Sequence, residues 1–148
     1  MSDLRDLYQE VIFDHYKTPR NHHALADPSH VAHGHNRLCG DQVTVYLQLE
    51  GDVIADLSFE GAGCAISTAS ASLMTDALKG KKLGEVEHLF EAFHRMVTQD
   101  DAEPDPALGK LEVLAGVREF PARVKCATLA WHTLQAALKQ RSVPVSTE

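Results

Sequence analysis

The chain has 148 residues, of which 44% are hydrophobic and 24% charged, and its formal net charge is −7. These are the proportions of an ordinary globular domain, and the acidic balance argues against a nucleic-acid-binding protein, which usually presents a basic face. The longest apolar run has three residues, as in Val53-Ile54-Ala55, whereas a membrane helix needs about 20. We therefore expect no membrane span. The first residues predict no secretory signal, so we expect a cytoplasmic protein.

The first predicted element is a helix with an apolar stripe at helical spacing. Ser2 or Asp3 can cap its start, and Pro19 ends it because the residue before a proline leaves the helical region. The stripe consists of Leu4, Leu7, Tyr8, Val11 and Ile12. The segment that follows, Arg20 to Asn36, is rich in histidine and predicts a loop.

Two runs of alternating apolar and polar residues then predict a β-hairpin, over residues 43–49 and 53–59. Gly51-Asp52 lies between them and suits a type II′ turn. One face of the hairpin is apolar, so helices must cover it. In the second strand, the apolar face is expected to carry Val53, Ala55, Leu57 and Phe59.

The rest of the chain predicts helices with one exposed acidic loop between them. The helices are expected at 65–78, ended by Gly80, after Leu83-Gly84 with an apolar face from Val86 to Val97, at 108–117, and at about 125–139 after Pro121, with the loop at 100–106. The order of helix, strands and helices predicts an α+β fold. We expect a single domain over residues 1–141 and a disordered tail over 142–148.

Three cysteines lie at predicted joints between elements, and a reducing compartment disfavours disulfides between them. Cys39 precedes the hairpin, Cys64 follows a glycine turn at a helix start, and Cys126 opens the last helix. A helix start presents free N–H groups and a positive dipole end, which favour the thiolate form. A thiolate binds metal and acts as a nucleophile, so these cysteines are candidates for both roles.

Asp41 supplies a fourth candidate donor, because Cys39 and Asp41 are two apart and project to the same side of an extended segment. Three thiolates and one carboxylate form a four-coordinate set, and zinc accepts both ligand types. The residues alone leave alternatives open: each cysteine can be a buried apolar residue, and Asp41 can cap a turn. No Cys-x-x-Cys pair is present.

The motifs around these residues resemble the IscU-like family of iron–sulfur cluster assembly proteins. The predicted first helix, with Tyr8 and His15, also fits. The three motifs are Cys39-Gly40-Asp41, Gly61-Ala62-Gly63-Cys64-Ala65-Ile66-Ser67, and Arg123-Val124-Lys125-Cys126. The resemblance covers nearly the whole chain. It implies a small antiparallel sheet with helices packed on one face, the SufE/IscU-like fold.

Within that family the chain is similar to the SufU branch rather than the IscU branch. Cys64 and Cys126 are 62 residues apart, which implies an insertion at about 88–110 that IscU-type scaffolds lack. IscU proteins have a histidine directly before the third cysteine, where this chain has Lys125. The Leu-Pro-Pro-Val-Lys segment that IscU offers its chaperone is also missing.

The resemblance implies a zinc ion held by Cys39, Asp41, Cys64 and Cys126. It also implies a partner, a SufS-type cysteine desulfurase, whose own PLP cofactor releases sulfur from cysteine. In that scheme a histidine of the desulfurase binds the zinc and frees Cys39, which then attacks the enzyme's persulfide. Cys39 suits this role because it lies in a predicted loop, whereas Cys64 and Cys126 suit the role of fixed ligands.

Other charged residues near these motifs have two interpretations each. Arg123 can stabilise a thiolate or persulfide, or pair with the partner, and it can equally be a solvated surface charge; the same holds for Lys125. The histidine-rich loop can bind metal, but a polar surface is its ordinary role. It contains His22, His23, His30, His33 and His35. If a fifth group competes for zinc, we expect His33 or His35.

Three functions are compatible with this site. The first is a zinc-dependent sulfurtransferase that stimulates a cysteine desulfurase, and the insertion and the absent histidine favour it. The second is a scaffold on which a [2Fe–2S] cluster is assembled, since thiolate-rich tetrahedral sites suit both zinc and iron–sulfur clusters. The third is a purely structural zinc domain, which Asp41 disfavours because closed structural sites use Cys and His.

Overall fold

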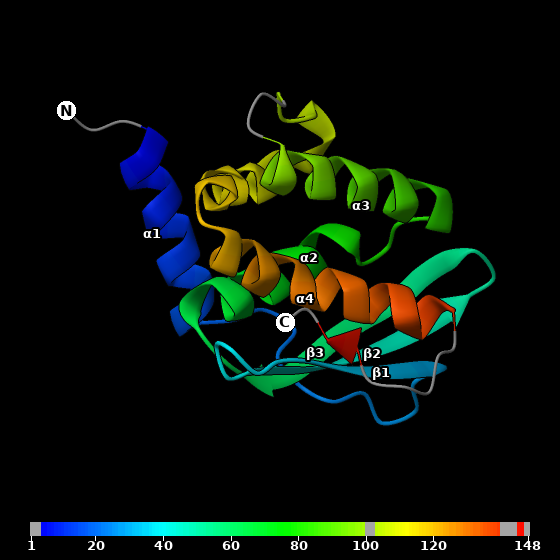
Figure 1. Ribbon diagram of the computed structural model, residues 1–148. Coiled ribbons are helices and arrows are strands. Elements are labelled where there is room, and N and C mark those ends of the chain that lie inside the picture. The colour runs from blue at the N-terminus through cyan, green and yellow to red at the C-terminus, as the bar shows by residue number, and fades with distance from the viewer. Residues whose placement is uncertain (1–3, 100–102, 140–144, 147–148) are drawn as a thin grey trace.

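The computed structural model of the chain describes residues 4–99, 103–139 and 145–146 (Figure 1). Its elements follow the predicted order of helix, strands and helices. They are α1 Leu4–Lys17, β1 His30–Asn36, β2 Asp41–Glu50, β3 Val53–Ala62, α2 Ala65–Leu78, α3 Leu83–Thr98, the 3₁₀ helix η1 Pro106–Glu119, α4 Pro121–Leu138 and β4 Val145–Ser146.

The strands form one sheet in the order β3-β2-β1-β4, in which β2 pairs antiparallel with both β1 and β3. The short β4 pairs parallel to β1 at Gly34 and His35. Helices α2 and α4 lie on one face of this sheet, and α3 and η1 form a further layer beyond them (Figure 1). The predicted α+β fold with helices on one face is confirmed.

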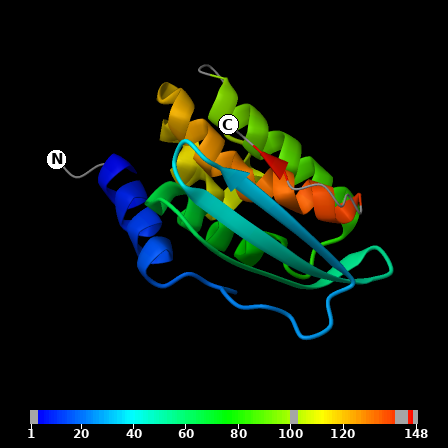
Figure 2. The same cartoon turned by 60° about the horizontal axis from the view of Figure 1, so that its bottom comes forward.

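Helix α1 ends at Lys17, before Pro19, as predicted. Tyr8, Val11 and Ile12 from its apolar stripe pack against the core. The predicted caps Ser2 and Asp3 lie outside the described residues. Figure 2 shows α1 beside the sheet, with the chain after it running along the sheet edge.

The segment from His30 to Asn36 is a strand, so the prediction of a loop throughout 20–36 is wrong. Its buried positions are Ala32, Gly34 and Asn36, which alternate with more exposed residues. The pattern was hidden because the buried face of β1 carries small or polar residues. A Cβ at Gly34 would overlap the hydroxyl of Thr133 in α4, so close packing against that helix requires the small side chain.

The hairpin of β2 and β3 is confirmed, and Gly51 at its turn has a φ of 63°. The predicted apolar face of β3 is wrong at its first half. The pairing register shifts between Gln48 and Leu49, which places Ile54 opposite Leu49 and leaves Ala55 unpaired. Because an extra residue in one strand reverses which side chains point inward, Ile54 is buried while Val53 and Ala55 are not.

The last helix begins at Pro121, four residues before the predicted start. Proline suits the first turn of a helix, since its missing N–H has no intrahelical partner there and its φ is already helical. We had expected Cys126 to open the last helix, and this prediction is wrong. Cys126 lies in the second turn of α4. The free N–H groups of this helix end are not available to its thiol.

The other helices agree with the prediction, with α2 at 65–78 followed by Gly80 at a φ of 87°. The element expected at 108–117 is the longer η1, kinked at Gly109 with a φ of 53°. In the expected acidic loop, residues 103–105 form neither helix nor strand, Pro106 begins η1, and 100–102 lie outside the described residues.

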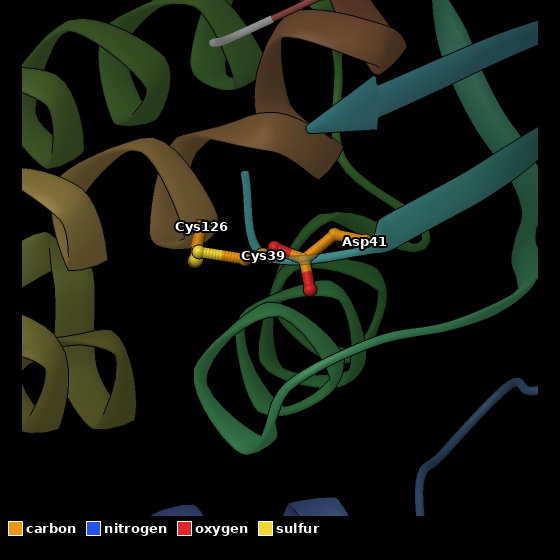
Figure 3. Close-up of side chains that lie close together, drawn as sticks. All are labelled: Cys39, Asp41 and Cys126. Carbon is orange, nitrogen blue, oxygen red and sulfur yellow. The ribbon is translucent and has the colours of Figure 1, made fainter. Parts of the chain in front are cut away.

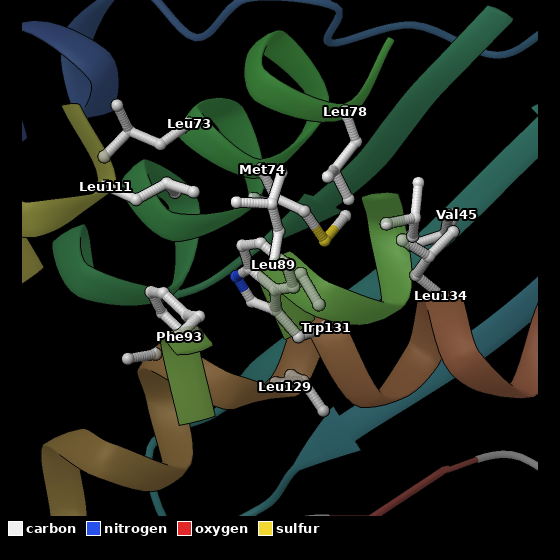
Figure 4. Close-up of a cluster of buried hydrophobic side chains, with 14 of the residues drawn as sticks. Val45, Leu73, Met74, Leu78, Leu89, Phe93, Leu111, Leu129, Trp131 and Leu134 are labelled. Atoms are coloured by element: carbon white, nitrogen blue, oxygen red, sulfur yellow. The ribbon is translucent and has the colours of Figure 1, made fainter. Parts of the chain in front are cut away.

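The core lies between the sheet and the two helical layers, around the indole of Trp131 in α4 (Figure 4). The Phe93 ring of α3 stacks on it, with 4.5 Å between centroids and 13° between planes. The Trp131 side chain is 1% exposed. This packing fixes α4, and with it Cys126, relative to the sheet.

Two residues of the predicted tail, Val145 and Ser146, form β4, and the rest of 140–148 lies outside the described residues. The division into a domain over 1–141 and a disordered tail stays a prediction. Within the described ranges, no helix is long and apolar enough to cross a membrane.

Candidate metal centre

The connection between β1 and β2 carries the first cysteine. Asn36 ends β1 and Asp41 begins β2, and the two are paired across the ladder. Between them Arg37, Leu38, Cys39 and Gly40 make a tight turn, in which Gly40 adopts a φ of 70°. Cys39 is exposed, whereas Asn36 and Asp41 at the base of the turn are each 1% exposed. Cys39 and Asp41 thus come together through a turn, rather than through the extended segment that we expected.

Asp41 is fixed by the loop that precedes α2. Its Oδ1 accepts a hydrogen bond of 2.8 Å from the backbone N–H of Cys64. A Cβ at Gly63 would overlap the same oxygen, so this position has to be glycine for the carboxylate to fit. Glycine, which has no Cβ, allows this close approach of the backbone to the carboxylate. With Oδ1 engaged, Oδ2 is the oxygen left to bind a cation.

Cys64 caps the N-terminus of α2, as its place after the glycine turn predicted. Its Sγ accepts a hydrogen bond of 3.4 Å from Ser67 N–H and lies 3.9 Å from Asp41 Oδ2. Cys64 is half-buried. This thiol has the environment of a helix start, with free N–H groups and the positive dipole end, that favours a thiolate.

Cys126 approaches from α4 and is 2% exposed. The carbonyl of Ala127, the next residue, accepts a hydrogen bond of 2.6 Å from Ser70 Oγ in α2. That bond ties α4 to α2 one residue from the thiol. The Nδ2 of Asn36 faces Cys126 Sγ at 3.8 Å, which ties the same point to the end of β1.

One candidate donor set emerges from these elements. Single donor atoms of Cys39, Asp41 and Cys126 lie within 4.8 Å of one another (Figure 3). Figure 3 shows the Cys39 and Cys126 side chains meeting, with the Asp41 carboxylate beside them. Cys64 is not in this set of three, but its contact with Asp41 places it at the edge of the cluster. The structure therefore gathers all four residues expected as ligands, three of them closely.

Burial raises the pKa of the Cys126 thiol, and hydrogen bonds with Asp41, Cys39 and Cys64 raise it further. Burial removes the water that would stabilise a thiolate, and the neighbouring thiols and carboxyl group favour the neutral thiol further. A bound divalent cation reverses this balance, because it deprotonates a coordinating thiol outright. The cluster is thus costly to ionise alone and suited to ionise around a metal.

The donor chemistry fits a four-coordinate metal. Three sulfurs and one carboxylate oxygen can surround zinc tetrahedrally, and a thiolate-rich tetrahedral site also suits iron–sulfur clusters. Zinc–sulfur bonds are about 2.3 Å long, so two sulfurs bound tetrahedrally to one ion lie about 3.8 Å apart. The donor atoms of Cys39, Asp41 and Cys126 lie within 4.8 Å of one another, so they need to draw together by up to about 1 Å to hold one ion.

Arg123 and two of the histidines, His33 and His35, lie outside the donor set. The Arg123 guanidinium is exposed and packs over the ring of Phe120, 4.9 Å from the centroid. His33 and His35 line a groove on the sheet beside Asp41. The Nδ1 of His33 lies 2.9 Å from Thr44 Oγ1. Neither histidine belongs to the donor set, so their suggested competition for zinc stays a prediction.

Sequence reasoning gave Asn36 no role, although it begins the segment that contains Cys39. Its amide contacts Cys126, and its Oδ1 is buried with no hydrogen-bond partner among the described residues. The available signal was its position: Asn36 and Asp41 are symmetrically placed about the four-residue turn. The signal is visible only if residues 30–36 are assigned to a strand, and their histidine-rich sequence predicted a loop instead.

Comparisons with known proteins agree with this geometry. Residues 7–127 match the family described as the NifU-like N terminal domain. The zinc-dependent sulfurtransferase SufU of Bacillus subtilis is 45% identical over 134 residues, which cover 90% of each chain. The iron–sulfur cluster assembly scaffold protein IscU of Streptococcus pyogenes is 42% identical over 140 residues, 95% of this chain and 87% of that protein.

Solved structures give the same result. A crystal structure of a putative SUF-system scaffold protein from Fervidobacterium islandicum superposes with a TM-score of 0.83 at 36% identity, over 90% of this chain and 98% of that one. A NifU-like N-terminal protein from Brucella abortus gives a TM-score of 0.83 at 28% identity, over 94% and 96%. The chain therefore belongs to the NifU-like N-terminal domain family, the family of the SufU and IscU iron–sulfur cluster assembly proteins.

Proposed function

We propose that this chain is a zinc-dependent sulfurtransferase of iron–sulfur cluster assembly, which accepts sulfur on Cys39 from a SufS-type cysteine desulfurase. The observation that carries the proposal is the unequal exposure of the donors. Asp41 and Cys126 are buried, and Cys39, within reach of both, is the least buried of the three and lies on a turn. A purely structural site has no need of one exposed sulfur.

The proposed ligands are Cys39, Asp41, Cys64 and Cys126. Zinc, when bound, keeps thiols deprotonated at neutral pH and shields them from oxidation. The protein contributes the arrangement: the turn supplies Cys39, the loop before α2 orients Asp41 through Cys64 N–H, and α4 supplies Cys126. The carboxylate is the weakest ligand of a thiolate-rich set, so it suits a site that must open.

Cys39 is the proposed nucleophile. Its thiolate attacks the terminal sulfur of a persulfide on the desulfurase. A bond forms between Cys39 Sγ and that sulfur, the sulfur–sulfur bond of the enzyme's persulfide breaks, and the electron pair leaves with the enzyme's cysteine as a thiolate. The exchange consumes no oxidant or reductant. It requires that the partner reach Cys39, and the exposed turn allows that.

The rim of the site supports the docking of a partner protein. Leu38, beside Cys39, is 74% exposed, and Phe120, at the start of α4, is 51% exposed. Arg123 covers the Phe120 ring and adds a cation near the cluster. We propose Arg123 as a group that meets the partner or its persulfide, which is one of the two interpretations that the sequence left open.

The main alternative is a scaffold on which a [2Fe–2S] cluster is assembled. The similarity to proteins named IscU scaffolds favours it, and the same four donors would serve. Against it stands Lys125, where the resemblance leads us to expect a histidine in an IscU-type site. The histidine of an IscU-type site would offer a ring nitrogen to the metal. The Lys125 ammonium cannot bind a metal while it is protonated.

The test compares zinc-loaded and zinc-stripped protein in stimulating the turnover of cysteine by a SufS-type desulfurase. We expect the zinc-loaded protein alone to stimulate. Asp41→Ala is expected to reduce the stimulation of the desulfurase strongly, while the variant still folds. Equal stimulation by the stripped protein, together with a coloured cluster on addition of iron and sulfide, would establish the scaffold instead. Wholesale unfolding of Asp41→Ala would favour a structural site.

A further inference from the structure

The Asn36 side chain joins the end of β1 to α4 at the proposed site. Its Nδ2 lies 3.8 Å from Cys126 Sγ, and both residues are buried, at 1% and 2% exposure. The contact joins residues that are 90 apart in the sequence.

The chemistry of the contact is specific. An amide N–H is a donor, and a sulfur accepts a hydrogen bond well only when it carries negative charge. The amide places its nitrogen toward the sulfur, while its Oδ1 is buried without a partner. A buried unpaired carbonyl is expensive. Packing alone would favour an apolar side chain here, so the donor has a function.

The position of Asn36 shows what that function is. Asn36 and Asp41 face each other across the base of the turn that carries Cys39. The backbone of Asn36 is thus part of the hairpin that supplies two donors, while its side chain contacts the donor of α4. A single residue therefore belongs to the hairpin that carries Cys39 and Asp41 and contacts Cys126 on α4.

We propose that Asn36 is a positioning residue of the metal centre, which donates a hydrogen bond to the metal-bound thiolate of Cys126 and holds it in register with Cys39 and Asp41. Groups that hydrogen-bond to metal ligands typically change metal affinity by about 10–100-fold when they are removed. This inference rests on the proposed metal site. It adds a residue that touches neither the metal nor the transferred sulfur.

The test measures metal affinity and the spectrum of the metal–sulfur bond in the full chain, without any desulfurase. Zinc affinity is determined by competition with a chromophoric chelator. The same variants are loaded with cobalt(II), whose sulfur-to-metal charge-transfer band reports the electron density on the bound sulfurs. The variants are Asn36→Ala, which removes the donor, and Asn36→Asp, which keeps the shape but places a carboxylate beside the thiolate.

We expect Asn36→Ala to lose about 10-fold or more in zinc affinity, within the range of such groups. Asn36→Asp is expected to lose more, because like charges repel in a buried site. The charge-transfer band should shift to lower energy in Asn36→Ala, because an unbonded thiolate gives up an electron more readily. Gln48→Ala is the matched control, since it removes another amide with a buried unpaired oxygen from the same sheet; it should leave affinity and band unchanged.

Two results would overturn the inference. One is unchanged affinity and an unchanged band in both Asn36 variants. The other is a loss of affinity in Asn36→Ala that is matched by destabilisation of the metal-free protein, with the band unmoved, which is the behaviour of a packing residue. Failure of the wild-type chain to bind zinc would instead refute the proposed function, so the two failures are distinguishable.

Discussion

The turn at residues 37–40 and the second turn of α4 each bring one cysteine to the site, in opposite ways. Cys126 is buried on a helix that Trp131 fixes in the core and that Ser70 ties to α2. Cys39 is exposed on a tight turn between two strands. The fold therefore separates a fixed anchor from an accessible sulfur, which is the division that a sulfur acceptor requires.

The largest expected effect is on transfer. Cys39→Ser removes the proposed nucleophile, so sulfur transfer from a desulfurase should fall by about 10³-fold or more, as the loss of a nucleophile usually costs. The free energy of unfolding of the metal-free protein should change by less than about 0.5 kcal/mol, since the site is exposed. Transfer is measured with labelled cysteine, and unfolding with urea. Retained sulfur transfer in Cys39→Ser would show that Cys39 is not the sulfur acceptor.

Cys126→Ser is expected to affect metal binding and folding together. Zinc binding of about 10–16 kcal/mol shared by four ligands corresponds to about 3 kcal/mol each, or about 100-fold in affinity. A buried hydroxyl without a good partner should also cost about 1–3 kcal/mol of unfolding free energy in the metal-free protein. Chelator competition and urea unfolding measure the two effects. If Cys39→Ser lowers the unfolding free energy of the metal-free protein as much as Cys126→Ser does, the two cysteines do not differ in their structural role.

Gly63→Ala tests how Asp41 is held. The added methyl group would overlap Asp41 Oδ1, so the carboxylate must move and zinc affinity should fall by about 10-fold, the scale of a displaced supporting group. Gly40→Ala is the control on the turn. Its φ of 70° costs about 1–2 kcal/mol for alanine, but its Cβ would meet nothing within 4 Å. Equal affinity losses in the two variants would indicate backbone strain as the common cause.

The smallest expected effect concerns a region remote from the metal. His15 is buried where α1 meets α2, with its Nδ1 2.7 Å from Ser72 Oγ. Burial holds its pKa below the ordinary value of 6.5, and the nearby Arg20 charge lowers it further. Between the two pKa values the unfolded chain binds more protons, so the stabilisation is present above pH 6.5 and is lost as the pH falls below it.

Urea unfolding of the metal-free protein at pH 7.5 and 5.5 measures this dependence. His15→Gln should have a smaller difference between the two pH values than the wild type. Cys39→Ser should keep the wild-type difference. An unchanged difference in His15→Gln would assign the acid sensitivity to other groups.

Much of this architecture could be predicted from local pattern. Pro19 ended the first helix, the alternation over residues 43–49 defined β2, and Gly80 ended α2. These signals act within a few residues of the chain, so they can be read from the sequence alone. The tertiary packing agrees with them. The helix expected after Leu83-Gly84 is α3 and was likewise predicted from local pattern.

The errors had long-range causes. The strand at 30–36 was missed because its buried residues are small, as packing of Gly34 against Thr133 in α4 requires. Ile54 was placed on the wrong face because one extra residue in β3 changes the register. The set of donors was suggested by the resemblance to a family, while spacing alone left it open. The role of Asn36 depends on a contact with a residue 90 positions away.

The central claim is that the exposed sulfur, and not a buried one, receives the transferred atom. The most direct measurement incubates the zinc-loaded chain with a SufS-type desulfurase and cysteine, traps persulfides by alkylation, and locates them by peptide mass spectrometry. The account predicts a persulfide on Cys39. A persulfide on Cys64 or Cys126 with none on Cys39, or no persulfide while the desulfurase turns over, would contradict it.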